Sequence, residues 1–314
     1  MLSRTTLPAL ATSLLFLGGG SVGFAQFGDA QLGERVTQRW KVGMVVSAEQ
    51  GPCNGLYGTI PVPTDWPEQK VRVVSEEISS SVKAVHYRTL NDGVKQMLVS
   101  VPRLMPGESA EALVTFEIDR AATLPPDDTD KFVIPTKMNR SIRQYLSASP
   151  FIEVRHKKIK RLAAELHDEQ LNAWQQVEKI YDHVRATVKF RNGKLKGALA
   201  ALNDGFGDCE ELTSLFIAIC RVNKIPSRTV WVPGHCYPEF YLINAQGEGQ
   251  WFPCQAAGTR AFGEMPDPRP ILQKGDNFKV PEKKQRQRYV TEFLKGAGGR
   301  PSVQFVRELL PVDG

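Results

Sequence analysis

Residues 207–212 read Gly-Asp-Cys-Glu-Glu-Leu and place a cysteine at the predicted start of an amphipathic helix. Asp208 is a typical N-cap, and Glu211, three residues later, completes a capping-box pattern. Cys209 is then the first helical residue, where the helix dipole favours a thiolate by about 0.3–1 kcal/mol. Its acidic neighbours, Asp208, Glu210 and Glu211, oppose that effect. A nearby imidazolium therefore has to supply most of the lowering of the thiol pKa.

His235 is the candidate source of that imidazole, because it opens an apolar strand downstream of the helix. Between the two residues, the stretch 224–228 (Lys-Ile-Pro-Ser-Arg) ends the helix and a strand leads to Gly234. An adjacent base activates a cysteine nucleophile. We therefore expect the Cys209 sulfur and the His235 ring to face each other across a cleft, about 3–4 Å apart. The alternative is a structural cysteine and a strand histidine without a chemical role.

The other cysteines allow several interpretations. The chain has five cysteines, so at least one thiol is free or pairs between chains. If residues 244–249 form a hairpin turn, Cys236 and Cys254 lie almost opposite each other, within disulfide range. The alternatives are two small packed thiols, or a metal site that also uses Cys209 and His235; the second would quench the nucleophile. Cys220, by contrast, lies among apolar helix residues and is expected to be buried and inert.

The first residues are typical of a secretory signal peptide. Arg4 supplies a positive start, residues 7–17 are apolar, and cleavage is expected after Ala25. Residues 1–25 would then be removed and the mature chain secreted or periplasmic; an uncleaved anchor is the alternative. No later segment is long and apolar enough to predict a membrane span.

The formal net charge is +6, which reflects a modest excess of basic over acidic residues. Basic residues cluster at 156–161 and 283–288, without the interleaved aromatic residues that stack on nucleic acid. We interpret both clusters as solvated faces and expect no nucleic-acid partner. Attraction to an anionic surface or polymer stays open.

Period-two patterns dominate the N-terminal part and predict a β-sandwich over 26–122. Apolar residues alternate in 36–46 and again in 114–118. Residues 91–93 (Asn-Asp-Gly) predict a tight turn between two strands. His86 falls within one of these strands, and we interpret it as structural.

The strand-like pattern ends at a predicted linker, 123–141, which is rich in Pro and Asp. Helical spacing begins near residue 142 and is clearest in 171–188, where Trp174 is expected in the core. The pattern predicts a second domain over 142–265 and a C-terminal extension over 266–314 that adds a strand or a short helix. The aperiodic stretch 261–280 is either an ordered cover over the site or a flexible tail.

The second domain resembles a known family. The resemblance covers about residues 160–258 and is carried by 207–209, 215–221, 225–228, 235–240 and 251–253. These stretches are similar to the transglutaminase-like superfamily, which shares a papain-like Cys-His-Asp arrangement. The resemblance implies an α+β fold, with an N-terminal β-sandwich followed by helices packed on an antiparallel sheet. Sandwich domains of this kind often precede the core in exported bacterial members.

The same resemblance implies Cys209 as nucleophile, His235 as base and an acidic third residue just after the Trp-x-Pro strand. This sequence has Gln255 at that place. A glutamine oxygen can accept the hydrogen bond that orients the imidazole, but it lacks the charge that stabilises imidazolium. Asp267 in the following loop is the alternative. We expect the oxyanion donors to be the Cys209 backbone N–H and a group within 203–206.

These observations predict an exported cysteine enzyme that acts on amide bonds, as a protease, amidase or crosslinking acyltransferase. The expected partner is a protein or peptide substrate, or a cell-envelope polymer. No metal or organic cofactor is required, and no EF-hand-like calcium loop is present. A catalytically impaired protein that binds a protein or polymer is the second hypothesis, favoured by Gln255. A thiol-based redox protein using Cys236 and Cys254 is the third.

Overall fold

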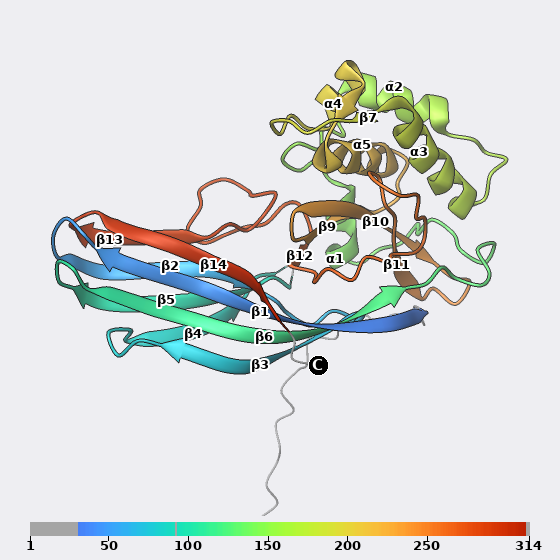
Figure 1. Ribbon diagram of the computed structural model, residues 1–314. Helices are drawn as coiled ribbons and strands as arrows, with labels where there is room; N and C mark the ends of the chain where they lie inside the picture. The colour runs from blue at the N-terminus through green and yellow to red at the C-terminus, as the bar shows by residue number, and fades with distance from the viewer. Residues whose placement is uncertain (1–30, 92, 312–314) are drawn as a thin grey trace, which may run out of the picture.

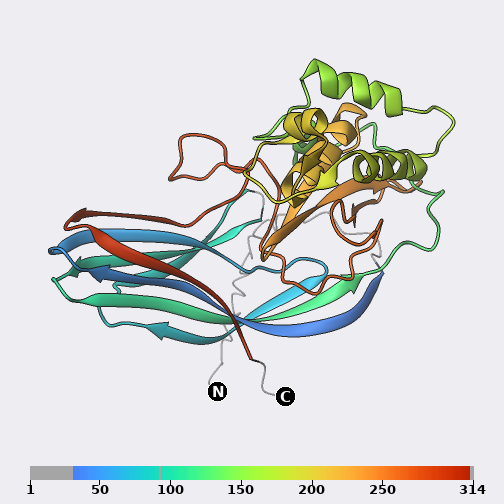
Figure 2. The same cartoon turned by 45° about the horizontal axis from the view of Figure 1, so that its top comes forward.

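A computed structural model describes residues 31–91 and 93–311. The expected signal peptide, residues 1–25, lies outside the described residues. Strands gather in one half of the molecule, and most of the helices cover a smaller sheet in the other half (Figure 1). The view in Figure 2 separates the two halves and shows strands near both ends of the chain lying together.

Two antiparallel four-stranded sheets form the β-sandwich. The first has the order β14-β1-β6-β3 and contains β1 (Leu32–Ala48), β3 (Gln69–Ile78), β6 (Ser109–Thr123) and β14 (Pro301–Leu310). The second has the order β13-β2-β5-β4 and contains β2 (Cys53–Val62), β4 (Ala84–Thr89), β5 (Lys95–Leu104) and β13 (Phe293–Gly298). Alternate apolar residues of the two sheets share one buried cluster, because successive strand residues point to opposite faces.

The C-terminal residues complete this sandwich. β14 pairs with β1 over Arg39 to Ala48, and β13 pairs with β2. The predicted boundaries, 26–122 and 266–314, assigned these strands to separate parts of the chain. Their pairing covers edge strands that would otherwise expose unpaired backbone groups.

A third antiparallel sheet forms the base of the other half, in the order β11-β10-β9-β12. It contains β9 (Ser227–Val232), β10 (His235–Ile243), β11 (Gly249–Pro253) and β12 (Gln273–Lys274). One face is covered by α2 (Lys157–Leu166), α3 (Ala173–Thr187), α4 (Ala198–Asp204) and α5 (Cys209–Val222) (Figure 1). The shorter elements are α1 (Arg140–Arg143), a 3₁₀ turn (Gln144–Leu146), and the parallel pair β7 (Lys189–Phe190) and β8 (Phe206–Gly207).

The predicted fold class, a β-sandwich with an α+β core, is confirmed. The strands β4 and β5, on either side of the predicted turn, pair antiparallel; Asp92 lies outside the described residues. His86 is exposed on β4.

Helix α5 lies at the centre of the α+β core. Its residues Glu211 to Arg221 are buried, because α2, α3 and α4 surround it on one side and β10 on the other. Trp174 of α3 contacts Phe240, Phe252 and Phe262 edge to face, so it belongs to the core as predicted.

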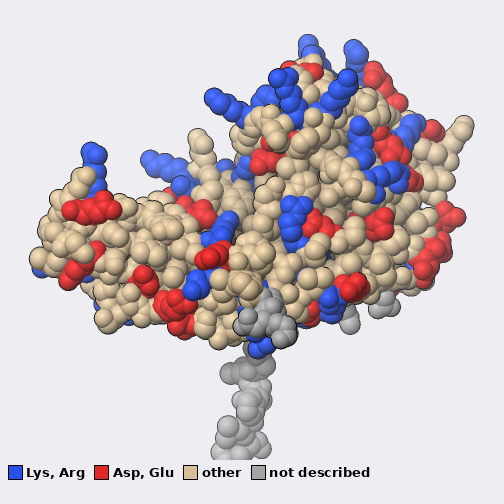
Figure 3. Space-filling view, in the orientation of Figure 1, with Lys and Arg blue, Asp and Glu red and all other residues tan. Residues whose placement is uncertain are grey.

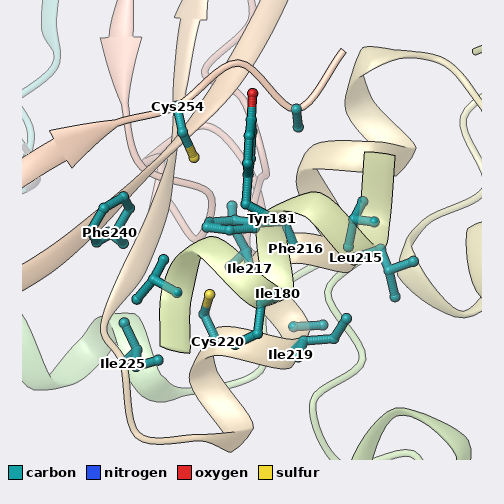
Figure 4. Close-up of a cluster of buried hydrophobic side chains, with 14 of the residues drawn as sticks. Ile180, Tyr181, Leu215, Phe216, Ile217, Ile219, Cys220, Ile225, Phe240 and Cys254 are labelled. Carbon is teal, nitrogen blue, oxygen red and sulfur yellow. The ribbon is translucent and has the colours of Figure 1, made fainter. Parts of the chain in front are cut away.

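Two of the cysteines lie in this apolar core. Figure 4 shows Cys220 and Cys254 among the buried residues around Tyr181. Burial raises the pKa of both thiols, so neither is a thiolate at neutral pH. The predicted linker also contributes to this core: Phe132 is buried against Phe252.

A buried ionic network joins the two halves. The Lys274 ammonium on β12 lies 2.5 Å from the Glu68 carboxylate and 2.6 Å from the Glu239 carboxylate. Arg228 of β9 pairs with Glu239 at 2.8 Å, and Arg120 of β6 donates to the Glu68 carbonyl at 3.5 Å. All five side chains are buried. Since Glu68 and Arg120 come from the sandwich half, the network fixes the sandwich against the core sheet.

The two basic clusters differ in the structure. Lys157, Lys158, Lys160 and Arg161 are exposed on α2, which lies at the top of the space-filling view in Figure 3. Arg288 of the second cluster is instead 13% exposed and pairs with Glu210, so 283–288 is not simply a solvated face. Within 31–91 and 93–311, no helix combines the length and the apolarity needed to cross a bilayer.

Candidate active site

The predicted capping box forms at the start of α5. An Asp208 carboxylate oxygen accepts from the Glu210 N–H at 2.8 Å, and Glu211 accepts from the Asp208 N–H at 3.1 Å. Gly207 has to be a glycine here, because a Cβ at that position would lie 2.4 Å from the Glu211 Cβ. This local structure makes Cys209 the first residue of the helix.

Glu211 has a second role that the sequence did not indicate. Its side chain is 1% exposed, and its other oxygen accepts from the backbone N–H groups of Lys196 at 2.7 Å and Gly197 at 3.3 Å. One carboxylate therefore joins the helix start to the loop between β7 and α4. That loop carries Asn192 and Leu195, which line the cleft beside Cys209.

The structure brings Cys209 and His235 together. A tight turn with Gly234 at φ +67° connects β9 to β10, so His235 begins β10 beside the start of α5. The two side chains are hydrogen-bonded to each other. His235 Nε2 lies 2.8 Å from Gln255 Oε1, so Nδ1 is the ring nitrogen that faces the sulfur.

Gln255 is the residue that holds the far side of the ring. Its backbone N–H donates to the Ala261 carbonyl at 2.8 Å. Its own carbonyl accepts from the Tyr181 hydroxyl at 2.9 Å and from Arg185 at 2.8 Å, both on α3. These contacts fix the backbone from which the amide reaches His235. Burial raises the pKa of Tyr181 to about 12, which keeps its hydroxyl a donor at neutral pH.

The alternative third residue, Asp267, does not take this place. Its carboxylate accepts from the Arg269 guanidinium at 2.9 and 3.0 Å. Arg269 also donates to the Pro233 carbonyl at 3.0 Å, which ties the stretch after β11 to the turn before His235. Of the two interpretations of 261–280, an ordered segment beside the site is therefore the one the structure supports.

Cys236 is a buried free thiol beside the site, which agrees with the packed-thiol interpretation and not with the disulfide. Its buried thiol is hydrogen-bonded to Cys209 and lies 3.9 Å from the hydroxyl of Thr213, one turn further along α5. The Cys254 N–H bonds to the Pro238 carbonyl, so Cys254 is opposite Pro238 and not opposite Cys236.

All five cysteines are free thiols. The Cys236–Cys254 disulfide is therefore wrong: the hairpin loop sets a register that staggers the two by two residues. Across 31–91 and 93–311, no group of three or more His, Cys, Asp or Glu side chains is arranged to hold a metal ion.

The contacts around Cys209 favour its thiolate form. Hydrogen bonds from Cys236 and then from His235 outweigh burial and lower the Cys209 pKa to about 4. Burial lowers the pKa of His235, but its hydrogen bonds to Cys209 and Gln255 outweigh that effect and leave it raised above 6.5. Between these two pKa values, the geometry favours a thiolate–imidazolium pair.

A cleft of about 890 Å³ opens above this pair. Cys209 and His235 lie on one wall, and the sandwich supplies Trp40 from β1 and Arg307 from β14. Other parts of the lining are Phe190, Asn192, Leu195, Trp231, Arg288 and Tyr289. The sequence analysis missed the sandwich residues, because strand patterns do not show which loop or sheet end meets the core.

Residues 203–206 do not supply the expected second oxyanion donor at the cleft. No residue of 203–206 lines the cleft, and the Asn203 side chain instead accepts from Lys158 at 2.6 Å. Asn192 is an amide side chain that does line the cleft wall next to Cys209.

Comparison with known proteins agrees with this geometry. Residues 160–256 match the family model of the transglutaminase-like superfamily. These residues form a transglutaminase-like core. The matched range contains Cys209, His235 and Gln255, and it ends just after β11.

A solved structure is similar over nearly the whole chain. It is described as "a Putative Cysteine Protease" from Cytophaga hutchinsonii, and it aligns with a TM-score of 0.56 at 15% sequence identity. The alignment covers 90% of this chain and 94% of that one, so it shows a shared fold for both the sandwich and the transglutaminase-like core. No curated protein matches the chain.

The lowered pKa of Cys209 predicts an unusual reactivity at acid pH. At about pH 5.5 Cys209 is almost fully ionised, whereas a free thiol of pKa about 8.5 is roughly 0.1% thiolate. The weaker nucleophilicity of a low-pKa thiolate offsets about 10²-fold of that advantage. We expect iodoacetamide to alkylate Cys209 on the order of tenfold faster than a cysteine peptide.

The direction of this pH dependence follows from the lowered pKa of Cys209. Because the pKa is lowered to about 4, the reactive thiolate is present above that value and is lost as pH falls through it. The measurement is the alkylation rate at Cys209 by peptide mapping from pH 3 to 8, with a cysteine peptide as control. A rate that rises only above pH 7, like that of the control, would refute the ion pair.

Proposed function

We propose that this protein is a cysteine enzyme that acts on amide bonds through Cys209 and His235. The observation that carries the proposal is the hydrogen-bonded Cys209–His235–Gln255 series at the cleft. The fold shared with transglutaminase-like proteins agrees with it.

The chemistry follows from the two protonation states. The Cys209 thiolate attacks the amide carbonyl, and the carbonyl oxygen gains negative charge. The first amides of α5 have no partners one turn earlier in the helix, so the N–H of Cys209 is placed to stabilise that charge. His235 then gives its proton to the leaving amine. Water resolves the thioester in hydrolysis, and a second amine resolves it in crosslinking.

Gln255 supplies orientation without charge. Its oxygen accepts from His235 Nε2 and keeps Nδ1 directed at the sulfur. Since a thiolate already balances the imidazolium, a neutral acceptor is sufficient for the ring to hold its position. This is the physical reason for preferring an enzyme over a binding module that has lost its third residue.

The cleft also fits a chain-like substrate. Its lining joins the transglutaminase-like core to the sandwich, and its apolar and aromatic walls suit a protein or peptide segment. An amide within such a segment would lie over Cys209. We therefore propose a protein or peptide as substrate.

A casein assay tests the proposal. Casein is incubated with the protein, with and without a fluorescent primary amine, and both cleavage and amine incorporation are measured. Fragments identify hydrolysis, and labelled casein identifies acyl transfer; either activity is expected to disappear in Cys209→Ala.

A chloroacetamide probe tests the site without depending on the substrate. Labelling at Cys209 is expected to be rapid and confined to that site. Absence of casein turnover together with labelling no faster than that of a peptide thiol would favour the binding module and reject the enzyme.

The proposal includes export of the mature chain. It rests on the sequence of residues 1–25, with cleavage after Ala25. N-terminal sequencing of the protein from its native cell is expected to begin at Gln26; a sequence that begins at Met1 would contradict it.

A further inference from the structure

We propose that Cys209 and Cys236 form a peroxide-reactive thiol pair, in which a disulfide between them blocks the nucleophile reversibly. The proposal uses the nucleophilic thiolate of the proposed function but none of its amide chemistry. It assigns Cys236 the role of a resolving thiol, the second cysteine that reacts with an oxidised first one.

The position of Cys236 is the first observation. Its side chain lies over the first turn of α5, where its sulfur is 3.9 Å from Thr213 Oγ1. Cys209 is four residues before Thr213, on the same side of the helix. The thiol of Cys236 donates a hydrogen bond to the sulfur of Cys209, which makes the two thiols neighbours.

The difference in access between the two sulfurs is the second observation. Cys209 is partly exposed and lines the cleft, so a small oxidant can reach it. Cys236 is completely buried behind it. Peroxide therefore meets Cys209 first, and the product of that reaction has Cys236 as its neighbour.

The remaining cysteines cannot take this role. Cys220 and Cys254 lie in the apolar core (Figure 4), away from the cleft lining. Cys53 is buried in the sandwich, where its thiol donates to the Gly299 carbonyl at 3.1 Å. Cys209 and Cys236 are thus the pair that the fold brings together.

The first step oxidises Cys209. Its thiolate attacks the outer oxygen of a hydroperoxide, the O–O bond breaks, and the S–O bond of a sulfenic acid forms. The leaving alkoxide takes the proton of the His235 imidazolium and departs as an alcohol. The peroxide has gained two electrons, and His235 is left neutral.

The second step forms the disulfide. The proton of Cys236 passes to the imidazole that the first step left neutral, and the Cys236 sulfur attacks the sulfur of the sulfenic acid. The S–S bond forms and the S–O bond breaks. Hydroxide leaves with the proton from His235 as water. In sum, two thiols and one hydroperoxide give one disulfide, one alcohol and one water.

The pair protects the site from irreversible loss. A sulfenic acid without a neighbouring thiol goes on to sulfinic acid under further peroxide, and that product is not restored by thiols. A disulfide is restored by a reducing thiol. We therefore expect peroxide to inactivate Cys209 reversibly in this protein.

The test treats the full chain with tert-butyl hydroperoxide and maps its peptides without reduction. The expected result is a linked pair of peptides containing Cys209 and Cys236, an intact mass lower by two hydrogens, and return of chloroacetamide labelling after dithiothreitol. Cys254→Ala, a buried thiol outside the site, is the matched control and is expected to behave like the wild type.

Two variants sharpen the result. In Cys236→Ala and Cys236→Ser, the same treatment is expected to leave sulfinic acid at Cys209, with labelling not restored by dithiothreitol. The proposal is overturned if wild-type Cys209 gains oxygen without forming a disulfide, or pairs with another cysteine. Because mass and peptide linkage are read without an amide substrate, a linked pair would support this inference even in a protein that does not turn over casein, so the two proposals can fail separately.

Discussion

Replacing Glu239 with Gln is expected to lower the free energy of unfolding by about 3–5 kcal/mol. The Glu239 carboxylate is 2% exposed, and it pairs with Lys274 at 2.6 Å and with Arg228 at 2.8 Å. The amide keeps the shape but removes the charge, so two buried cations lose their shared partner. Urea unfolding followed by circular dichroism measures the effect.

The exposed pair between Arg161 and Glu165 supplies the matched control. Glu165→Gln is expected to leave the urea midpoint nearly unchanged, because solvent screens an exposed pair. Adding Arg228→Met to Glu239→Gln should recover part of the loss, since Arg228 pairs with Glu239, whereas Lys274 keeps the Glu68 carboxylate as a partner. A double variant no more stable than Glu239→Gln alone would show that the loss comes from packing and not from charge.

Replacing His235 with Ala is expected to lower amide turnover by roughly 10²–10⁴-fold, the usual contribution of a general acid–base group. The imidazole raises the thiolate population of Cys209 and supplies the proton for the leaving amine. The measurement is the initial rate of casein cleavage or amine incorporation. His86→Ala, at an exposed histidine on β4, is the control and should keep the full rate.

Variants at Gln255 separate orientation from charge. Gln255→Ala should reduce turnover less than His235→Ala, since the imidazole remains but loses the acceptor 2.8 Å from Nε2. Gln255→Asp adds a negative charge beside the ring and should raise the pKa of His235 further, so activity persists to higher pH. An Asp variant whose upper pH limit moves down would contradict the assigned role of this residue.

Much of the local structure follows directly from short sequence patterns. The capping box at Asp208 and Glu211 predicts the start of α5, and the apolar spacing in 171–188 predicts α3. These features depend on hydrogen bonds and side chains a few residues apart. They therefore need no knowledge of the rest of the chain.

The resemblance to a family also predicted which residues form the site. The family's motifs identify such residues even where they are distant in the sequence. It implied that position 255 faces His235, and the hydrogen bond between the two side chains is present. The chemical role of the three residues stays a prediction until turnover is measured.

The predictions that failed concern contacts between residues that are far apart in the sequence. One of the interpretations of Cys236 paired it with Cys254, but the register of β10 with β11 sets Cys254 against Pro238. Register depends on the turn geometry and on the packing of a whole face, which no single residue reveals. The true neighbour of Cys236 lies on α5.

By itself the sequence determined the elements, the helix start that carries Cys209 and the family of the core, because each depends on nearby residues or on ordered motifs. Only the tertiary structure decided that β13 and β14 close the sandwich, that Trp40 and Arg307 line the cleft, and that Cys236 is hydrogen-bonded to Cys209. These contacts join residues far apart along the chain, and packing of the two halves around a buried ionic network selects them.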